Sequence, residues 1–385
     1  MLAILGATGY TGRLVVDEAR RAGLPLRLVG RRREALEELA RDGEEIRVAD
    51  AGDGASLRSA FEGAFAVASL AGPFLEVGYE PVAAAIDAGA HYLDITGEQE
   101  FTRRVYADFG PRAAERGLVL LSAFGMDYVP GDLAARIAAE KLLPAPAPAK
   151  PAPPRRSRSG AGEAGTSAIW PAPSRLRRPG GSVEPTPLAP LDEVAVAYSF
   201  SGAGTSKGTK KTMALLAGRP HSAWVGGRLV ESRLGATSRT FPFPFGDAEC
   251  QEWGGTEPLT VPRHTVVREV RSYARIPKAI TKVGAVAKPA LELAAKLRPA
   301  GPSPEDRTKS RLAVIAIARR GEELRTATLT GSDPYGLTAL LIVRGYESLR
   351  AGEARSVGAR APAEAFDARS FLARLPPLLA LADEP

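Results

Sequence analysis

Three glycines near the amino terminus, Gly6, Gly9 and Gly12, have the spacing of a nucleotide-binding turn. They follow a short apolar run that reads as a buried strand and precede a segment with a helical pattern. There the first glycine permits a tight turn, the second lets the backbone approach a pyrophosphate, and the third lets the helix pack on the strand. The helix amino terminus would point its free N–H groups at the phosphates. We therefore predict a dinucleotide site formed by Gly6, Thr8, Gly9, Tyr10, Thr11 and Gly12.

Arg31 and Arg32 indicate which dinucleotide this site binds. They end the second expected strand, where an NAD site usually carries an acidic residue for the ribose 2′-hydroxyl. Here the first acid is Glu34. Guanidinium groups match the oxygens of a 2′-phosphate, so we predict NADP (NADPH) and regard NAD as the weaker fit. The alternative is that these arginines are exposed residues at the start of a helix, which is our expectation for Arg33.

Two further segments are expected to contact the cofactor. Asp50 ends the third strand and is placed to accept a hydrogen bond from the adenine amino group, although it could equally cap the next helix. The fourth strand is followed by a loop suited to pass beneath the ribose and nicotinamide, unless it is an ordinary turn. That loop is Ala71, Gly72, Pro73 and Phe74.

Alternating strand and helix patterns predict an α/β fold, a Rossmann-type doubly wound parallel sheet, followed by a second α+β domain. The expected strands of the first domain are 2–5, 26–29, 45–49, 64–70, 91–95 and 118–122, with helices at 10–22, 33–41, 55–61, 79–88 and 99–116. Asp132 is expected to cap a helix that runs to about residue 142. The second domain is expected to contain strands 193–200, 260–268, 312–319 and 324–330 and helices 209–217, 279–297 and 336–350. The predicted domains are 1–143, 191–360, and a last helix within 361–385 (about 362–381) that packs back on the body.

Length and composition describe a soluble protein. The 385 residues suit two domains, and the 44% hydrophobic and 25% charged content is that of a globular chain. Cys250 is the only cysteine, which excludes a disulfide framework, and three scattered histidines give no reason to expect a metal site. The chain shows no signal peptide or membrane span, so we expect a cytoplasmic protein.

A Pro/Ala/Arg-rich tract, residues 144–190, accounts for most of the positive charge. It holds seven Lys or Arg and two Glu, so that only +2 of the net charge of +7 belongs to the rest of the chain. Its composition is that of a disordered linker or insertion. We expect no nucleic-acid partner. We expect the basic, apolar segment 279–297 to form a helix packed on the second domain. The alternative is that it makes peripheral contact with a membrane or a carrier protein.

Several motifs together resemble the saccharopine dehydrogenase-like oxidoreductases: "GATGYTGRL", "GRRREALEEL", "LAGPF", "HYLDITGE" and "SAFGMDYVPGDL", then more weakly "GTSKGT", "GPSPEDR" and "GSDPYGLTA". Among its branches the chain most resembles the trans-acting enoyl reductases of actinobacterial lipid synthesis. The resemblance implies a Rossmann domain and an α+β domain for substrate and dimerisation, hence a homodimer. The chain departs from the family in its long tract and in Ala203, where glycine is usual.

The family motifs bring polar side chains toward the expected nicotinamide end: Tyr92, Asp94, Thr96, Glu98, Asp127 and Tyr128, joined by Ser206, Lys207 and Thr209. We name Tyr128, Asp127 and Thr209 as catalytic candidates, Tyr128 as a proton donor and Thr209 as the cap of a helix facing a substrate carbonyl. For Asp94 and Asp127, backbone capping is slightly favoured over catalysis.

Three functions remain open. The first is NADPH-dependent reduction of an enoyl or carbonyl group on an acyl lipid. The second is a saccharopine-type dehydrogenase acting on a secondary amine or imine, whose carboxylate-binding arginines could be Arg228, Arg233, Arg239 and Arg263. The third is a non-catalytic NADP-binding redox sensor. Fold alone cannot separate the first two.

Overall fold

The computed structural model describes residues 1–142, 189–202, 204–216, 218–278 and 301–382. Met1–Leu142 and Pro190–Pro385 form one compact unit, and the account below concerns that unit alone. The predictions for the tract 144–190 and the helix 279–297 lie outside the described residues, apart from Ala189 and Pro190.

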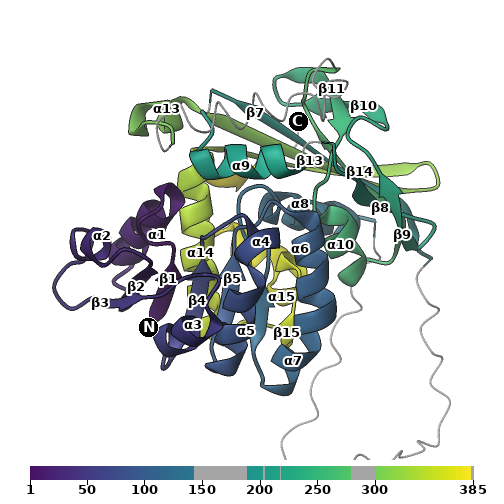
Figure 1. The fold of residues 1–385 in the computed structure, drawn as a ribbon. Coiled ribbons are helices and arrows are strands. Elements are labelled where there is room, and N and C mark those ends of the chain that lie inside the picture. The colour runs from purple at the N-terminus through teal and green to yellow at the C-terminus, as the bar shows by residue number, and fades with distance from the viewer. Residues whose placement is uncertain (143–188, 203, 217, 279–300, 383–385) are drawn as a thin grey trace, which may run out of the picture. The chain divides into compact units, whose positions relative to one another are not determined.

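Seven parallel strands form the first sheet, in the order β15-β6-β5-β4-β1-β2-β3 (Figure 1). The strands are β1 (Leu2–Leu5), β2 (Leu26–Gly30), β3 (Glu45–Val48), β4 (Ala66–Ser69), β5 (His91–Asp94), β6 (Val119–Leu121) and β15 (Gly358–Ala359). Their helices are α1 (Tyr10–Arg21), α2 (Arg33–Glu37), α3 (Gly54–Phe61), α4 (Phe74–Val77), α5 (Tyr79–Asp87), α6 (Gln99–Arg104), η1 (Val105–Phe109), α7 (Gly110–Glu115) and α8 (Val129–Glu140). The order of β1 to β6 is that of a Rossmann fold, which confirms the predicted class.

Both faces of β1 are buried, which explains its unbroken apolar run. In β1, Leu2 and Ile4 belong to the apolar core on one face, and Ala3 and Leu5 belong to the core on the other. The chain order reverses between β1 and β4, and such a switch point opens a crevice at the carboxyl edge of the sheet.

Nine strands form the second sheet, which is mixed. They are β7 (Leu191–Ser201), β8 (His221–Val225), β9 (Arg228–Ser232), β10 (Ser238–Phe243), β11 (Gly246–Glu252), β12 (Val267–Ala274), β13 (Arg311–Arg320), β14 (Glu323–Ser332) and β16 (Leu379–Leu381). The remaining helices are α9 (Lys207–Leu216), α10 (Glu257–Thr260), η2 (Val261–Arg263), α13 (Pro304–Lys309), α14 (Pro334–Arg350), α15 (Pro362–Ala365) and α16 (Ala368–Leu372). No helix in the described part of the chain is long and apolar enough to cross a membrane.

Each sheet packs against a helix that follows a strand of the other sheet in the sequence. α8 follows the last strand of the Rossmann motif but lies on β7, β13 and β14 of the second sheet. α14 follows β14 but packs beside α1 and against β5 of the first sheet. Buried residues of both helices therefore belong to a single apolar core that reaches both sheets.

Three element predictions are wrong. Residues 260–268 are not one strand, because α10 and η2 occupy 257–263 and β12 begins only at Val267. Asp132 is not the cap of α8, which begins three residues earlier with a proline in its first turn. The last helix is also absent: α15 and α16 are short, and Pro376 and Pro377, which lack the N–H a helix needs, precede β16.

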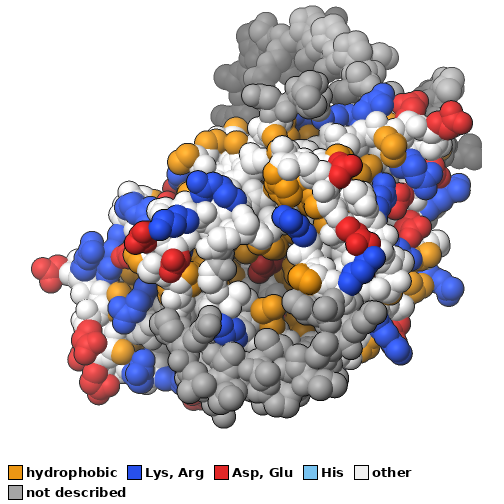
Figure 2. Space-filling view, turned by 90° about the horizontal axis from the view of Figure 1, so that it is seen from above, with side chains coloured by type: hydrophobic (Ala, Val, Ile, Leu, Met, Phe, Trp, Pro, Cys, Tyr) orange, Lys and Arg blue, Asp and Glu red, His pale blue; other side chains and the backbone are white. Residues whose placement is uncertain are grey.

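Charged side chains are mixed on the face shown in Figure 2. Among its described residues, Lys and Arg (blue) alternate with Asp and Glu (red), with hydrophobic side chains between them. This is the pattern of an ordinary solvated surface.

Candidate functional site

The glycine turn has the geometry that a pyrophosphate requires. Gly6 has a φ of +82°, and a Cβ there would lie 3.2 Å from the backbone of Leu70. A Cβ on Gly12 would lie 2.1 Å from the carbonyl oxygen of Gly6, so only glycine lets α1 lie this close to the turn. Gly9 precedes α1, and no side chain caps the helix or places an acid in its first turn. The N–H groups of this helix end thus remain available to an anion, and the residues fit a dinucleotide.

The other predicted residues of this turn lie as follows. Thr8 and Thr11 are partly exposed beside the glycines. Tyr10 begins α1, but its side chain points to the second domain, where the hydroxyl donates to the carbonyl oxygen of Pro302 at 2.6 Å. Burial raises the pKa of Tyr10 to about 12. Only the backbone of Tyr10 is therefore a candidate to contact the cofactor.

The arginines that follow β2 are free to bind a phosphate. The Arg31 side chain is 77% exposed, and its nearest carboxylate is that of Asp50 at 4.0 Å. Arg32 is exposed and directly precedes α2. Asp50 is exposed too and accepts a hydrogen bond from the N–H of Gly52 at 2.9 Å. Asp53, not Asp50, caps the following helix, which leaves Asp50 at the edge of the predicted site.

The loop from Ala71 to Phe74 is held by a carboxylate that we had expected near the nicotinamide. Glu98 accepts hydrogen bonds from the N–H groups of Phe74, at 2.8 Å, and Leu75, at 2.7 Å. Burial raises the pKa of Glu98, although these two hydrogen bonds oppose the shift. Glu98 therefore positions the loop, which follows β4 and lies next to the switch point; its contact with the ribose and nicotinamide stays a prediction.

The Asp94 carboxylate also accepts hydrogen bonds from backbone N–H groups. One of its carboxylate oxygens accepts from the N–H groups of Thr96 and Ala123, both at 2.9 Å, and so joins the loops that follow β5 and β6. Tyr92 and Thr96 are buried beside it. The capping alternative that the sequence left open is the one the structure supports for Asp94.

Tyr128 and Thr209 are both engaged in internal contacts. The Tyr128 hydroxyl donates to the carbonyl oxygen of Gly97 at 2.9 Å, and burial raises the pKa of the phenol well above its usual value. Thr209 does not cap α9, because the Ser206 hydroxyl accepts from the Thr209 N–H at 3.1 Å. The Thr209 hydroxyl lies 3.1 Å from that of Tyr335, while Lys207 is exposed.

Asp127 is different from the other candidates. It follows β6 and is partly buried, and its carboxylate makes no hydrogen bond or ion pair with any described residue. Burial raises the pKa of Asp127 to about 6. A carboxyl group that keeps its proton to near-neutral pH and has no internal partner is suited to general acid catalysis.

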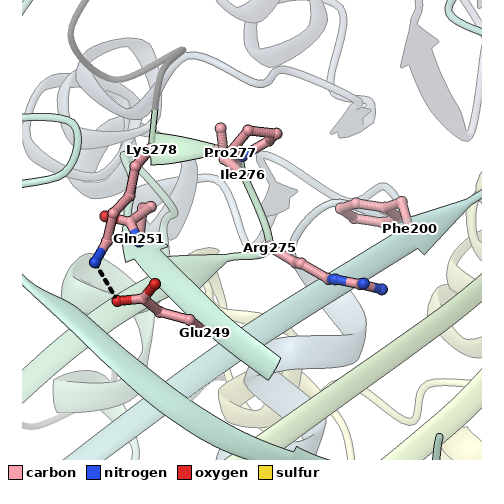
Figure 3. Close-up of a pocket in the computed structure, with 7 residues that line it drawn as sticks. All are labelled: Phe200, Glu249, Gln251, Arg275, Ile276, Pro277 and Lys278. Atoms are coloured by element: carbon pink, nitrogen blue, oxygen red, sulfur yellow. Dashed lines mark ion pairs between the residues drawn. The ribbon is translucent and has the colours of Figure 1, made fainter. Parts of the chain in front are cut away.

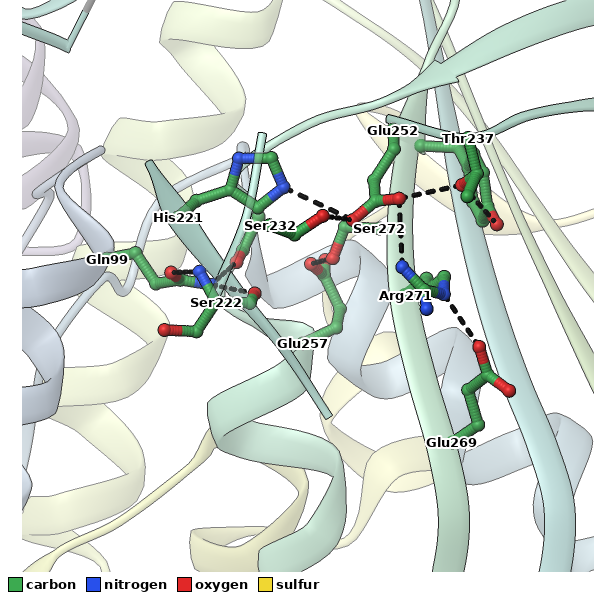
Figure 4. Close-up of polar contacts among 12 residues, drawn as sticks. Gln99, His221, Ser222, Ser232, Thr237, Glu252, Glu257, Glu269, Arg271 and Ser272 are labelled. Carbon is green, nitrogen blue, oxygen red and sulfur yellow. Dashed lines mark hydrogen bonds and ion pairs between the residues drawn. The ribbon is translucent and has the colours of Figure 1, made fainter. Parts of the chain in front are cut away.

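A polar network in the second domain was not predicted (Figure 4). Glu257 is fully buried and accepts hydrogen bonds from the hydroxyls of Tyr198 and Ser272. Burial raises the pKa of Glu257 to about 7. Gln99 of α6 links the two domains, because its amide donates to the carbonyl oxygens of Ser222 and Gly255 and accepts from the N–H of Ser222. No local pattern could reveal these contacts, since sheet register brings the partners together.

Glu252 is a second centre of this network. Burial alone would raise its pKa, but hydrogen bonds from His221, Ser232 and Thr237 and the charge of Arg271 hold the pKa at about 2. Within the described residues, no three His, Cys, Asp or Glu side chains lie together as a metal site would need.

Comparison with known proteins agrees with this geometry. Residues 6–139 match a family described as NAD(P)H-binding. A saccharopine dehydrogenase-like oxidoreductase of Arabidopsis thaliana is 37% identical over 149 residues, which cover 34% of this chain and 33% of that protein. This relative is a saccharopine dehydrogenase-like oxidoreductase, the family that the motifs of this chain resemble. A Mycobacterium tuberculosis protein whose name describes a trans-acting enoyl reductase is 36% identical over 141 residues, 34% of this chain and 33% of its own.

The likeness to saccharopine dehydrogenase extends to the second domain at the level of the fold. Saccharopine dehydrogenase from Saccharomyces cerevisiae superposes over 99% of both chains with a TM-score of 0.56 and 10% identity. This similarity concerns the fold alone. The sequence matches span about a third of the length of the relatives.

Proposed function

We propose that this saccharopine dehydrogenase-like protein is an NADPH-dependent oxidoreductase that reduces an enoyl or carbonyl group of an acyl substrate. The observation that carries the cofactor assignment is the pair of exposed arginines that follow β2, on a Rossmann sheet whose glycine turn leaves a helix amino terminus free. The enoyl substrate is supported by the name of the mycobacterial relative.

In this proposal the backbone of the glycine turn holds the pyrophosphate, Arg31 and Arg32 hold the 2′-phosphate, and the loop clamped by Glu98 lies under the nicotinamide. The cofactor, when bound, supplies a hydride. Asp127 delivers the proton that completes the reduction, since it is the catalytic candidate whose functional group has no internal partner among the described residues.

The saccharopine-type alternative has less support from the arginines proposed for it. Arg239 pairs with Glu193 at 3.0 Å, and Arg263 pairs with Glu364 at 2.8 Å, so both have internal partners. Arg228 and Arg233 are exposed. The homodimer, which follows from the family resemblance, and the cytoplasmic location, which follows from the sequence, remain proposals.

Titration of both cofactors tests the assignment. Each charge-assisted contact to phosphate contributes about 1.5–3 kcal/mol, so we expect at least a tenfold preference for NADPH over NADH. The double variant Arg31→Ala, Arg32→Ala should weaken NADPH and leave NADH almost unchanged. Arg33→Ala is the matched control, because this neighbouring arginine lies 3.7 Å from Glu37 within α2. Equal affinities in the parent protein would refute the NADPH assignment.

The reaction itself is tested by the loss of NADPH absorbance with a panel of enoyl and keto acyl thioesters. We expect turnover with at least one acyl thioester and its loss in Asp127→Asn, with NADPH affinity unchanged. Turnover of amino-acid and keto-acid mixtures instead would favour the saccharopine-type alternative. Unimpaired turnover in Asp127→Asn would remove Asp127 as the proton donor.

A further inference from the structure

A pocket of about 310 Å³ lies in the second domain (Figure 3). Its lining comes from the end of β7, from β11 and from the residues that follow β12, and includes Phe200, Gln251, Arg275 and Ile276. The volume is at the lower limit of typical ligand sites, which suits a small head group and a short length of chain.

Gln251 gives this pocket a polar group that no described residue bonds. The residue is only 4% exposed, and its side-chain amide makes no hydrogen bond to any described residue. A bound ligand that accepts from the NH₂ group would form a hydrogen bond that the protein itself does not supply. The amide therefore provides a reason, independent of charge, to expect a polar ligand here.

Arg275 gives the pocket an unpaired positive charge. Its guanidinium lies over the ring of Phe245 at 5.4 Å, and no carboxylate of the described residues pairs with it. The other charges of the lining neutralise each other, since Lys278 pairs with Glu249 at 2.6 Å. Figure 3 shows the Arg275 guanidinium directed toward Phe200 and away from that ion pair.

Aromatic rings connect this pocket to the carboxyl edge of the Rossmann sheet. Phe200 stacks on Tyr198 at 5.9 Å, Tyr198 meets Trp253 at 5.7 Å, and Trp253 stacks on Tyr128 at 6.1 Å. Tyr128 in turn bonds to Gly97, next to Glu98. These rings are packed against one another, with Tyr198 fully buried, and form a continuous aromatic contact between the pocket and the proposed reaction centre.

We propose that the Gln251–Arg275 pocket binds the anionic head group, a carboxylate or a phosphate, of a substrate with an apolar chain. A planar guanidinium forms paired hydrogen bonds with either oxyanion, the Gln251 amide adds a donor, and Phe200 and Ile276 contact the adjoining carbons. This inference rests on the proposed function, because it assigns the substrate of that reaction an anionic end.

Calorimetric titration of the full chain with octanoate, octyl phosphate and octanamide tests the pocket. We expect both anions to bind and the neutral amide to bind at least about tenfold more weakly, since it forms no charge-assisted pair. The tighter anion identifies the head group. Arg275→Ala should weaken the anions about tenfold and bring them close to octanamide. Gln251→Leu, similar in volume, should weaken all three ligands.

Arg228→Ala is the matched control, because this exposed arginine at the start of β9 lies outside the pocket, and it should bind both anions as the parent does. Equal affinity for octanoate and octanamide, or unchanged affinity in Arg275→Ala, would overturn the proposal. Arg275 is exposed, so its removal should leave the melting temperature unchanged. NADPH titrated in the same samples separates the two proposals: failure to bind NADPH with intact octanoate binding would refute the proposed function alone.

Discussion

Asp127 combines a cost to stability with a possible role in chemistry. Its folded pKa of about 6 lies above the ordinary value, so the folded state holds a proton that the unfolded chain has released between about pH 4 and pH 6. Stability contributed by this site is therefore present at low pH and falls as pH rises through that window. At pH 7 the Asp127 carboxylate is ionised, and it lowers the free energy of unfolding by up to about 3 kcal/mol, the equivalent of the full pKa shift.

We accordingly predict that Asp127→Asn is more stable than the parent at pH 7 and that the gain shrinks toward pH 4. Thermal denaturation at both pH values measures this difference. Asp42→Asn, at an exposed position, is the control and should change the melting temperature little. An Asp127→Asn protein that is less stable at pH 7 would show that the carboxylate has a structural partner.

Glu98 should couple loop geometry to cofactor affinity. Glu98→Ala leaves the N–H groups of Phe74 and Leu75 without an acceptor, at a cost of about 1–3 kcal/mol for each group that stays buried. We predict a lower melting temperature together with weaker NADPH binding. Glu98→Gln retains one acceptor oxygen, so its melting temperature and NADPH affinity should lie between those of the parent and those of Glu98→Ala. A lower melting temperature with unchanged NADPH affinity would mean that the loop does not touch the cofactor.

At the scale of elements, α8 is attached to its surroundings by the buried carboxylate of Asp132. Asp132 accepts from His264 at 2.9 Å and from the N–H of Ala363 at 2.8 Å, so one carboxylate joins α8 to the residues after η2 and to α15. Burial alone would raise the pKa of Asp132, but the charge and hydrogen bond of His264 lower it. Stability from this group is present above about pH 4 and is lost as pH falls through the lower folded pKa.

We predict that Asp132→Ala loses about 3–5 kcal/mol of unfolding free energy at pH 7, because His264 remains buried without its partner. The loss should be smaller at pH 3, because the stability contributed by a lowered carboxyl pKa declines once pH falls below the unfolded value of about 4. Urea denaturation at both pH values gives the two differences. Arg33→Ala, which removes an exposed ion pair with Glu37 within α2, should cost far less. A pH-independent loss would exclude charge as the cause.

The sequence predicted the elements that depend on local pattern and missed those that depend on register. β1, β2 and β5 are short, largely buried runs between glycines and helices, and they lie close to where they were predicted. β8 to β11 are partly exposed and have mixed faces, so no alternation marked them. The run 260–268 is rich in β-branched residues, but Pro262 cannot donate to a central ladder, and the segment folds as α10 and η2 instead.

In the candidate site, too, the features that are continuous in sequence were predicted and those that depend on the tertiary fold were not. The glycine turn and its arginines could be located because the motif is continuous in sequence. Glu98 lies 24 residues from the loop that it clamps, and Gln99 lies 123 residues from Ser222, so their contacts follow from the tertiary fold. Gln251 and Arg275 carried no motif, and only the packing of β7, β11 and β12 places them around one pocket.

At the scale of the whole molecule, the exchange of α8 and α14 between the sheets predicts a single unfolding transition. The two domains share one apolar core. If either sheet unfolds, the other loses a helix that buries one of its faces. We predict that replacing residues 143–188 by a Gly/Ser linker preserves this single transition, the melting temperature and NADPH affinity. Calorimetry and titration of the replaced chain measure all three. Two resolved transitions in the parent would show that the domains unfold independently.

The last strands also constrain how the protein is made. β15 pairs with β6 at one edge of the first sheet, and β16 pairs with β14 at an edge of the second. Both strands lie after residue 357, so a nascent chain must keep β6 without β15 through most of its synthesis and β14 without β16 until near its end. Unpaired strand edges are sites of wrong association. Translation that stops before residue 358 therefore yields a chain with two open edges, and such products should be the ones that chaperones retain and proteases remove.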